Sequence, residues 1–140
     1  MDLYERGSVS DLVRYRIETA KSDLQSANIL MKEGEFRGAN NRAYYAIYHA
    51  ISAVHALNGN SYKRHKDTLA NFNKDYIKTE IFPKAFGRKI ARAEEIRHAS
   101  DYDDFYIATK EKAEEQIMTA KELIELIEAY CLKKCSIQSI

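Results

Sequence analysis

The sequence predicts an all-α fold: an antiparallel up-and-down bundle of four long or medium helices plus one short helix. Three observations support this prediction. Apolar residues recur at alternating spacings of three and four along several long segments, as in helices that bury one face. Breakers are rare, since the 140 residues include five glycines and one proline. No segment shows the two-residue alternation of a half-buried strand.

Length and composition indicate a single domain over residues 1–140, with a core from about residue 11 to residue 133. Hydrophobic residues make up 45% and charged residues 31%, which is typical of a globular chain and unlike a disordered one. The 22 Lys and Arg residues balance the 21 Asp and Glu residues, giving a net charge of +1. The overall charge therefore predicts no general attraction to nucleic acid or membranes, although it is compatible with a local basic patch.

No apolar run approaches the ~18 residues of a membrane span, and the N-terminus lacks the apolar segment of a signal peptide. The two cysteines, Cys131 and Cys135, form neither a disulfide framework nor a zinc-ligand pattern. We therefore expect reduced thiols in a cytoplasmic protein, with no membrane association, no metal and no cofactor.

The first helix is expected from about Ser10 to Glu33. Either Ser10 caps it, or Ser8 and Asp11 form a capping box, and Gly34 ends it. Its apolar stripe consists of Val13, Ile17, Ala20, Leu24, Ala27 and Met31.

The second helix is expected to start between Phe36 and Ala39 and to run to about Asn58, before Gly59. Its core stripe consists of Ala43, Ile47, Ala50, Val54 and Leu57. A second stripe, about 100° round the helix, consists of Tyr44, Tyr48, Ile51 and His55. Two non-polar faces predict a helix that is central in the bundle or forms an oligomer contact. We interpret the second stripe as packing rather than as a platform for stacked bases.

A short helix is expected over Asp67–Tyr76. Pro83 suits the first turn of a following helix that runs to about His98, and the polar stretch from Ser100 to Asp104 is expected to break it.

The last helix is expected to follow the N-cap Thr109 and to run to about Lys133. Its stripe consists of Ala113, Ile117, Ala120, Ile124, Ile127 and Cys131.

Arg97 is the most informative position, because it continues the apolar stripe of its helix yet carries a permanent charge. A buried guanidinium is costly unless it is paired. Two interpretations remain open. Arg97 either reaches water or pairs with Asp101 or Asp103, or it is held at the helix end to bind a phosphate, whose oxygens match its planar fork.

Basic residues elsewhere are further candidates for RNA contacts. Lys63 and Arg64 lie in a basic stretch, and Lys84, Arg88 and Arg92 recur at every fourth position before Arg97. Such a ridge suits RNA phosphates, although a solvated face is its commoner use. The sequence contains no glycine-rich phosphate loop and no nucleophile with a believable triad.

The residues Asn41–Ala50 read Asn-Arg-Ala-Tyr-Tyr-Ala-Ile-Tyr-His-Ala, which resembles the N-R-A-Y-Y-A-x-x-H-A signature of the HEPN superfamily. Arg97 followed by Asp101-Tyr102 resembles its second signature, and His65-Lys66 fits the segment between them. The chain is most similar to small stand-alone prokaryotic HEPN proteins, over roughly residues 11–130.

The resemblance implies a helical bundle that is usually a homodimer, with a minimal nucleotidyltransferase encoded beside it as an antitoxin. Many such proteins are metal-independent endoribonuclease toxins or defence effectors. In their motif an Arg stabilises charge on the scissile phosphate, and a His a few residues later handles the proton of the ribose 2′-hydroxyl. In related toxins a tyrosine of this region is adenylylated by the partner, which makes Tyr102 and Tyr106 candidates for modification.

This chain departs from the motif, because Tyr102 stands where that His is usual and His98 fills the polar position after Arg97. A phenol with a pKa near 10 is a poor base. We therefore expect a toxin–antitoxin or defence protein that binds RNA or nucleotide phosphate through Arg97 at a dimer interface. The alternatives are an active endoribonuclease using Arg97, His98 and Tyr102, and a purely structural dimerisation module.

Overall fold

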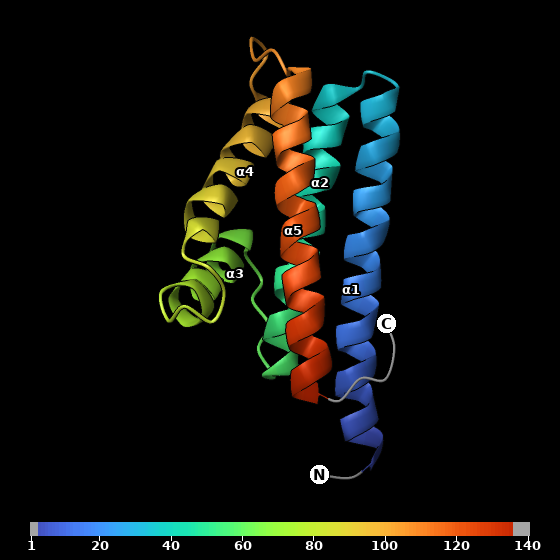
Figure 1. Ribbon diagram of the computed structural model, residues 1–140, viewed down its shortest axis with the longest axis vertical. Coiled ribbons are helices and arrows are strands. Elements are labelled where there is room, and N and C mark those ends of the chain that lie inside the picture. Colours follow the sequence, from blue (N-terminus) through green and yellow to red (C-terminus); the bar gives the residue numbers. More distant parts are fainter. Residues whose placement is uncertain (1–2, 136–140) are drawn as a thin grey trace.

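The computed structural model describes residues 3–135, with side chains described for residues 9–134. These residues form five α-helices and one π-helical turn and include no strand. The elements are α1 (Leu3–Lys32), α2 (Phe36–Leu57), α3 (His65–Phe72), η1 (Asn73–Ile77), α4 (Ala85–Tyr102) and α5 (Lys110–Cys135). The predicted all-α helical bundle is confirmed. In Figure 1, α1, α2 and α5 are long neighbouring rods, while α4 and α3 cover the other side.

The three long helices bury the predicted apolar stripes against one another. Ile17 of α1, Ile47 of α2 and Ile127 of α5 are each at most 1% exposed. The turn between α1 and α2 passes through Gly34, whose φ of +77° is readily adopted only by glycine. This side of the bundle is a compact apolar core, built mainly from aliphatic and alanine side chains.

Helix α2 lies at the centre of the bundle, as its two non-polar faces predicted. One face packs against α1 and α5, and the other packs against α3 and α4. On the second face Tyr44, Ile51 and His55 are buried, while Tyr48 is partly exposed. The second stripe therefore packs against the shorter helices within this chain.

Two predicted helix starts are wrong. Helix α1 begins at Leu3, so Ser8 and Ser10 lie inside it instead of capping it; each residue added to an existing helix gains a backbone hydrogen bond. Helix α4 begins at Ala85, so Pro83 precedes the helix, and its carbonyl accepts a hydrogen bond from the backbone of Phe86 at 3.0 Å.

The predicted helix end near His98 is also wrong, because α4 continues to Tyr102 and ends inside the polar stretch that was expected to break it. Residues of α2 hold this last turn. Asn40 Nδ2 donates to Ser100 Oγ at 3.0 Å, and Asn41 Nδ2 donates to Asp101 Oδ2 at 2.9 Å. Arg37 Nη1 donates to the carbonyl of Ser100 at 2.6 Å, which places a cation at the negative end of the helix.

The remaining boundaries agree with the sequence. The expected short helix corresponds to α3 followed by the π-helical turn η1. Thr109 Oγ1 accepts a hydrogen bond from the Lys112 backbone at 3.2 Å, as the predicted N-cap should. Within residues 3–135, no helix has both the length and the apolar character that a membrane crossing requires.

Candidate functional site

The side chain of Arg97 reaches from α4 towards α2 and is only 12% exposed. Its guanidinium carbon lies 4.7 Å from the ring centroid of Tyr44, a cation–π contact. Its Nη1 forms an ion pair with Asp101 Oδ2 at 3.6 Å, one turn further along the helix. Pairing with Asp101 is thus present, but the contact is long, and the buried Nε of Arg97 has no hydrogen-bond partner.

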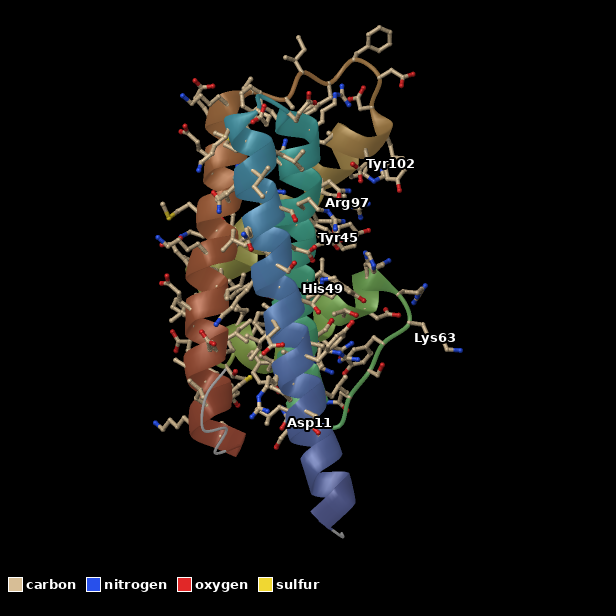
Figure 2. All side chains as sticks on the ribbon, turned by 90° about the vertical axis from the view of Figure 1, so that its right-hand side faces the viewer. Asp11, Tyr45, His49, Lys63, Arg97 and Tyr102 are labelled. Atoms are coloured by element: carbon tan, nitrogen blue, oxygen red, sulfur yellow. The ribbon has the colours of Figure 1, made fainter. Side chains whose placement is uncertain are left out.

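The ring of Tyr45 is the centre of a cluster of basic side chains from three helices. The guanidinium carbons of Arg42 and Arg97 lie 5.0 and 5.9 Å from its centroid. The imidazole centroids of His65 and His49 lie 5.6 and 6.2 Å from it. We call these five residues the Tyr45 cluster; Figure 2 shows Tyr45, His49 and Arg97 along the same side of the molecule.

Asp23 of α1 binds two members of the cluster. Its Oδ1 lies 3.0 Å from Arg42 Nη1 and its Oδ2 lies 2.9 Å from His49 Nδ1. A carboxylate only accepts hydrogen bonds, so Nδ1 of His49 carries the proton. The side chain of Asp23 is only 13% exposed, so the imidazole is held in one orientation with Nε2 directed away from Asp23.

His65, the first residue of α3, packs against the tyrosines of α2. Its ring centroid lies 4.1 Å from that of Tyr48, and its Nδ1 lies 3.4 Å from the hydroxyl of Tyr44. Burial and, next, the positive charge of Arg97 lower the pKa of His65, while the charge of Glu94 opposes them. Burial raises the pKa of Tyr44 well above its usual range, so its hydroxyl keeps its proton.

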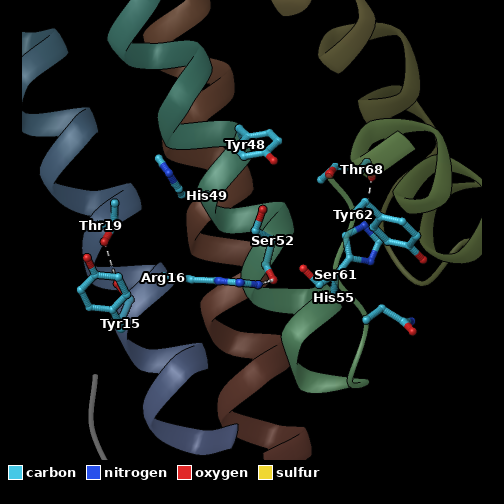
Figure 3. A pocket seen from close by; sticks show the side chains of 11 residues that line it. Tyr15, Arg16, Thr19, Tyr48, His49, Ser52, His55, Ser61, Tyr62 and Thr68 are labelled. Atoms are coloured by element: carbon cyan, nitrogen blue, oxygen red, sulfur yellow. Dashed lines mark hydrogen bonds between the residues drawn. The ribbon is translucent and has the colours of Figure 1, made fainter. Parts of the chain in front are cut away.

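A pocket of about 310 Å³ adjoins the cluster between α1, α2 and the segment that leads to α3 (Figure 3). Tyr48 and His49 line it, with Tyr15 and Tyr62 on opposite sides. Arg16 also lines it. The Arg16 Nη1 donates to a backbone carbonyl of α2 at 2.9 Å.

His55 forms part of the same pocket wall and is 1% exposed. Burial lowers its pKa, so the ring is neutral near neutral pH. Its Nε2 lies 2.9 Å from the carbonyl of Thr68 and must donate to it. Nδ1 is therefore an acceptor, and it has no hydrogen-bond partner.

The predicted catalytic residues lie close together at the end of α4, where Arg97 and His98 line one pocket. Arg97 faces α2, whereas His98 is exposed on α4 with its ring centroid 5.0 Å from that of Tyr102. Tyr102 is 67% exposed, and its ring centroid lies 5.9 Å from the Arg97 guanidinium carbon. The hydroxyl of Tyr106, the second modification candidate, is buried without a hydrogen-bond partner.

The predicted basic residues lie apart from Arg97. Arg92 faces α5, where its Nε forms an ion pair with Glu115 at 2.8 Å. Arg64 is paired with Asp67 at its own helix start, with an Nε–Oδ2 distance of 2.8 Å. The side chains of Lys63 and Arg88 are exposed. These residues do not extend the Tyr45 cluster into a continuous ridge.

Sequence reasoning did not select Asp23, Tyr45 or His65 as site residues. Asp23 carried a signal, because it falls three residues after Ala20 and four before Ala27, on the buried stripe of α1. The only sequence signal at His65 was its place in a basic stretch. Its position beside Arg97 depends on how α3 packs.

The cluster combines groups that bind anions with groups that transfer protons. Guanidinium groups hold phosphate oxygens, and imidazoles donate or accept protons near neutral pH. Among residues 9–134, no group of three or more His, Cys, Asp or Glu side chains is arranged to hold a metal ion.

Several known proteins are similar to this chain in sequence. The HEPN domain family matches residues 13–130. A UPF0332 protein of Thermotoga maritima is 30% identical over 117 residues, which cover 84% of this chain and 89% of that protein. A Methanocaldococcus jannaschii protein named "putative toxin" is 28% identical over 119 residues, 85% of this chain and 88% of that protein. A second protein of that name from the same organism is 25% identical over 118 residues, 84% and 80% of the two chains. The resemblance noted in the sequence is confirmed, and the chain belongs to the HEPN domain family.

Proposed function

We propose that this chain is a toxin-type HEPN protein that binds RNA through its backbone phosphates, with Arg97 as the anchor. The observation that carries this proposal is the Tyr45 cluster, in which two guanidinium groups and two imidazoles surround one aromatic ring. Single-stranded RNA is bound by this combination, because cations hold the phosphates and aromatic faces stack on bases. The names of the two archaeal relatives support the toxin-type role.

The carboxylates of the site leave Arg97 able to take a ligand. Asp101 makes one contact with it at 3.6 Å, longer than a charge-assisted hydrogen bond, and the buried Nε has no acceptor. A phosphate oxygen at the exposed part of the guanidinium would complete the pairing of Arg97. Arg42 is more tightly held, at 3.0 Å from Asp23, and acts mainly by keeping the face positive beside Tyr45.

A homodimer and a minimal nucleotidyltransferase partner are also part of the proposal. Next to Arg97, the end of α4 and the following loop expose large apolar side chains: Tyr102 is 67%, Phe105 93% and Ile107 79% exposed. A second copy bound there would cover them and bring two Tyr45 clusters together. Light scattering should give twice the 16.2 kDa chain mass, and a co-expressed nucleotidyltransferase should co-purify. A monomer that captures no such partner would contradict this part.

Binding is tested by fluorescence anisotropy with a short single-stranded RNA, comparing the Arg97→Gln and Arg92→Gln variants with the unchanged chain. Both substitutions remove one positive charge from α4, but Arg92 faces α5 and pairs with Glu115. Arg97→Gln should weaken binding by about tenfold or more and flatten its salt dependence, while Arg92→Gln should leave both nearly unchanged. Equal losses in the two variants would show that only net charge matters and would overturn the role of Arg97.

A further inference from the structure

We infer that His49 and His65 are a general base and a general acid for metal-independent cleavage of the RNA held at the Tyr45 cluster. This inference rests on the proposed function and goes beyond it. It assigns the proton transfers to α2 and α3, and not to His98 and Tyr102 at the exposed end of α4.

The two imidazoles flank the same pair of tyrosine rings. Relative to the Tyr45 centroid, His49 lies at 6.2 Å and His65 at 5.6 Å; relative to Tyr48, they lie at 5.6 and 4.1 Å. Both are partly exposed, so a ligand on this face reaches them. Arg97 lies on the same ring of Tyr45, so the guanidinium and both imidazoles are grouped around one ring.

The contact of His49 with Asp23 suits it to act as the general base. Asp23 fixes the proton on Nδ1 at 2.9 Å, which leaves the lone pair of Nε2 directed away from α1. The same carboxylate stabilises the imidazolium that forms when Nε2 takes a proton. Because Asp23 is nearly buried and also binds Arg42, this orientation is set by packing before any ligand arrives.

His65 is suited to be the acid. It faces the tyrosines and His49 of α2, and it faces Glu94 and Arg97 of α4. Its lowered pKa makes the protonated ring a strong proton donor. A phosphate bound beside Arg97 offsets the charge that lowers this pKa, and so increases the fraction of His65 that is protonated. When protonated, Nδ1–H donates to the Tyr44 hydroxyl oxygen and Nε2–H remains for the leaving group.

The reaction needs no other reactant. The 2′-hydroxyl oxygen of one ribose attacks the adjacent phosphorus, and His49 Nε2 takes its proton as the O2′–P bond forms. The P–O5′ bond breaks, and His65 gives its proton to the departing oxygen. The products are a 2′,3′-cyclic phosphate end and a 5′-hydroxyl end. Arg97 stabilises the added negative charge on the phosphoryl oxygens. The two imidazoles then exchange protons with water.

The adjoining pocket can bind the nucleoside next to the phosphate at Arg97. Its wall includes His49 itself, so a base placed there lies next to the phosphate. Tyr15 and Tyr62 offer aromatic faces.

The test incubates RNA with the purified chain in EDTA, using His49→Asn, His65→Asn and His98→Asn variants made in the same way. Cleavage should fall by about 100-fold in the first two and stay unchanged in His98→Asn, whose ring is exposed and outside the cluster. Anisotropy should show that all four proteins still bind RNA. A contaminating nuclease would cleave equally in every sample, and mass spectrometry should find cyclic phosphate ends.

The pH dependence of the cleavage rate distinguishes proton transfer by the two histidines from a merely structural role. The cleavage rate should have a bell-shaped pH profile, because His49 must be neutral and His65 must be protonated. His65→Asn should remove the fall of the rate at high pH. Circular dichroism checks that the variants fold. RNA that binds but stays intact, or cleavage that survives both substitutions, would overturn the inference and leave the proposed function standing. Failure of the unchanged chain to bind RNA would overturn both.

Discussion

The two sides of α2 are built from different kinds of side chain. Towards α1 and α5 it buries alanine, isoleucine and valine, which let the long helices pack closely. Towards α3 and α4 it presents tyrosines and histidines that pack as rings. A pocket lies beside these rings, between α1, α2 and the segment that leads to α3. One helix can therefore anchor a core and carry a site, provided that the two tasks use different faces.

The two sides also differ in how well their polar atoms are satisfied. Among the described residues, five buried side-chain polar atoms lack a hydrogen-bond partner, and three of them lie towards α3 and α4: Asn40 Oδ1, His55 Nδ1 and Arg97 Nε. Of the other two, Arg14 Nε belongs to α1 and the Tyr106 hydroxyl to the loop after α4. Such atoms reduce stability, and proteins tolerate them mainly at functional sites. We therefore expect the first side to determine the free energy of unfolding and the second to determine ligand binding.

The largest expected effect is on the packed side. Ile47→Ala removes a fully buried side chain between the long helices and should lower the free energy of unfolding by about 3 kcal/mol. Urea denaturation followed by circular dichroism measures this. The RNA affinity per folded molecule should not change. A loss below about 1 kcal/mol would mean that the core tolerates the cavity and would weaken the comparison.

Asp23→Asn should separate binding from proton transfer on the other side. It removes a negative charge beside Arg42 and His49, so RNA should bind more tightly. It also removes the carboxylate that orients His49, so cleavage in EDTA should slow by about tenfold or more. Anisotropy on these samples checks the predicted gain in RNA affinity, and gel assays on the same samples check the predicted loss of cleavage rate. Weaker binding together with unchanged cleavage would contradict the assigned role of Asp23.

The next effect is a pH dependence of stability that arises from His55. Burial lowers its folded pKa below the usual 6.5, so the unfolded chain takes up the proton first as the pH falls. Stability should be complete above about pH 6.5 and decline towards about pH 5, and His65 acts in the same direction. His55→Gln, which keeps a donor for the Thr68 carbonyl, should flatten the decline. Thermal melts across this range measure it, and an unchanged slope would rule His55 out.

The smallest effect is expected at the exposed ion pairs. Arg92→Gln breaks a 2.8 Å contact with Glu115, but both side chains are about half exposed to water. Solvent screening makes such pairs weak. The melting temperature of the Arg92→Gln variant should match that of the unchanged chain in side-by-side scans. A clear drop would mean that the α4–α5 surface contributes more to stability than this comparison allows.

Local patterns predicted the core but only part of the site. The stripes of Ile17, Ile47 and Ile127 follow from helical periodicity, and the pairing of Arg97 with Asp101 follows from their spacing of one turn. By contrast, Asp23 meets His49 across 26 residues of sequence. No local pattern encodes such a contact, because it depends on how α1 is placed against α2.

The end of α4 was mispredicted for the same reason. Ser100 and Asp101 are typical of a helix break in isolation. Arg37 reaches the Ser100 carbonyl from 63 residues earlier in the chain and supports an extra turn. The position of His65 beside Tyr48 likewise depends on the packing of α3, which is short and carries little periodic signal.

The central claim is that RNA binds on the α2–α3–α4 side, at the Tyr45 cluster. The most direct measurement is an NMR titration of the isotope-labelled chain with a short single-stranded RNA. The account predicts the largest shifts at Tyr45, His49, His65 and Arg97, with α5 and the part of α1 outside the pocket unaffected. Shifts that spread over α5 and the part of α1 outside the pocket and spare the cluster would contradict it.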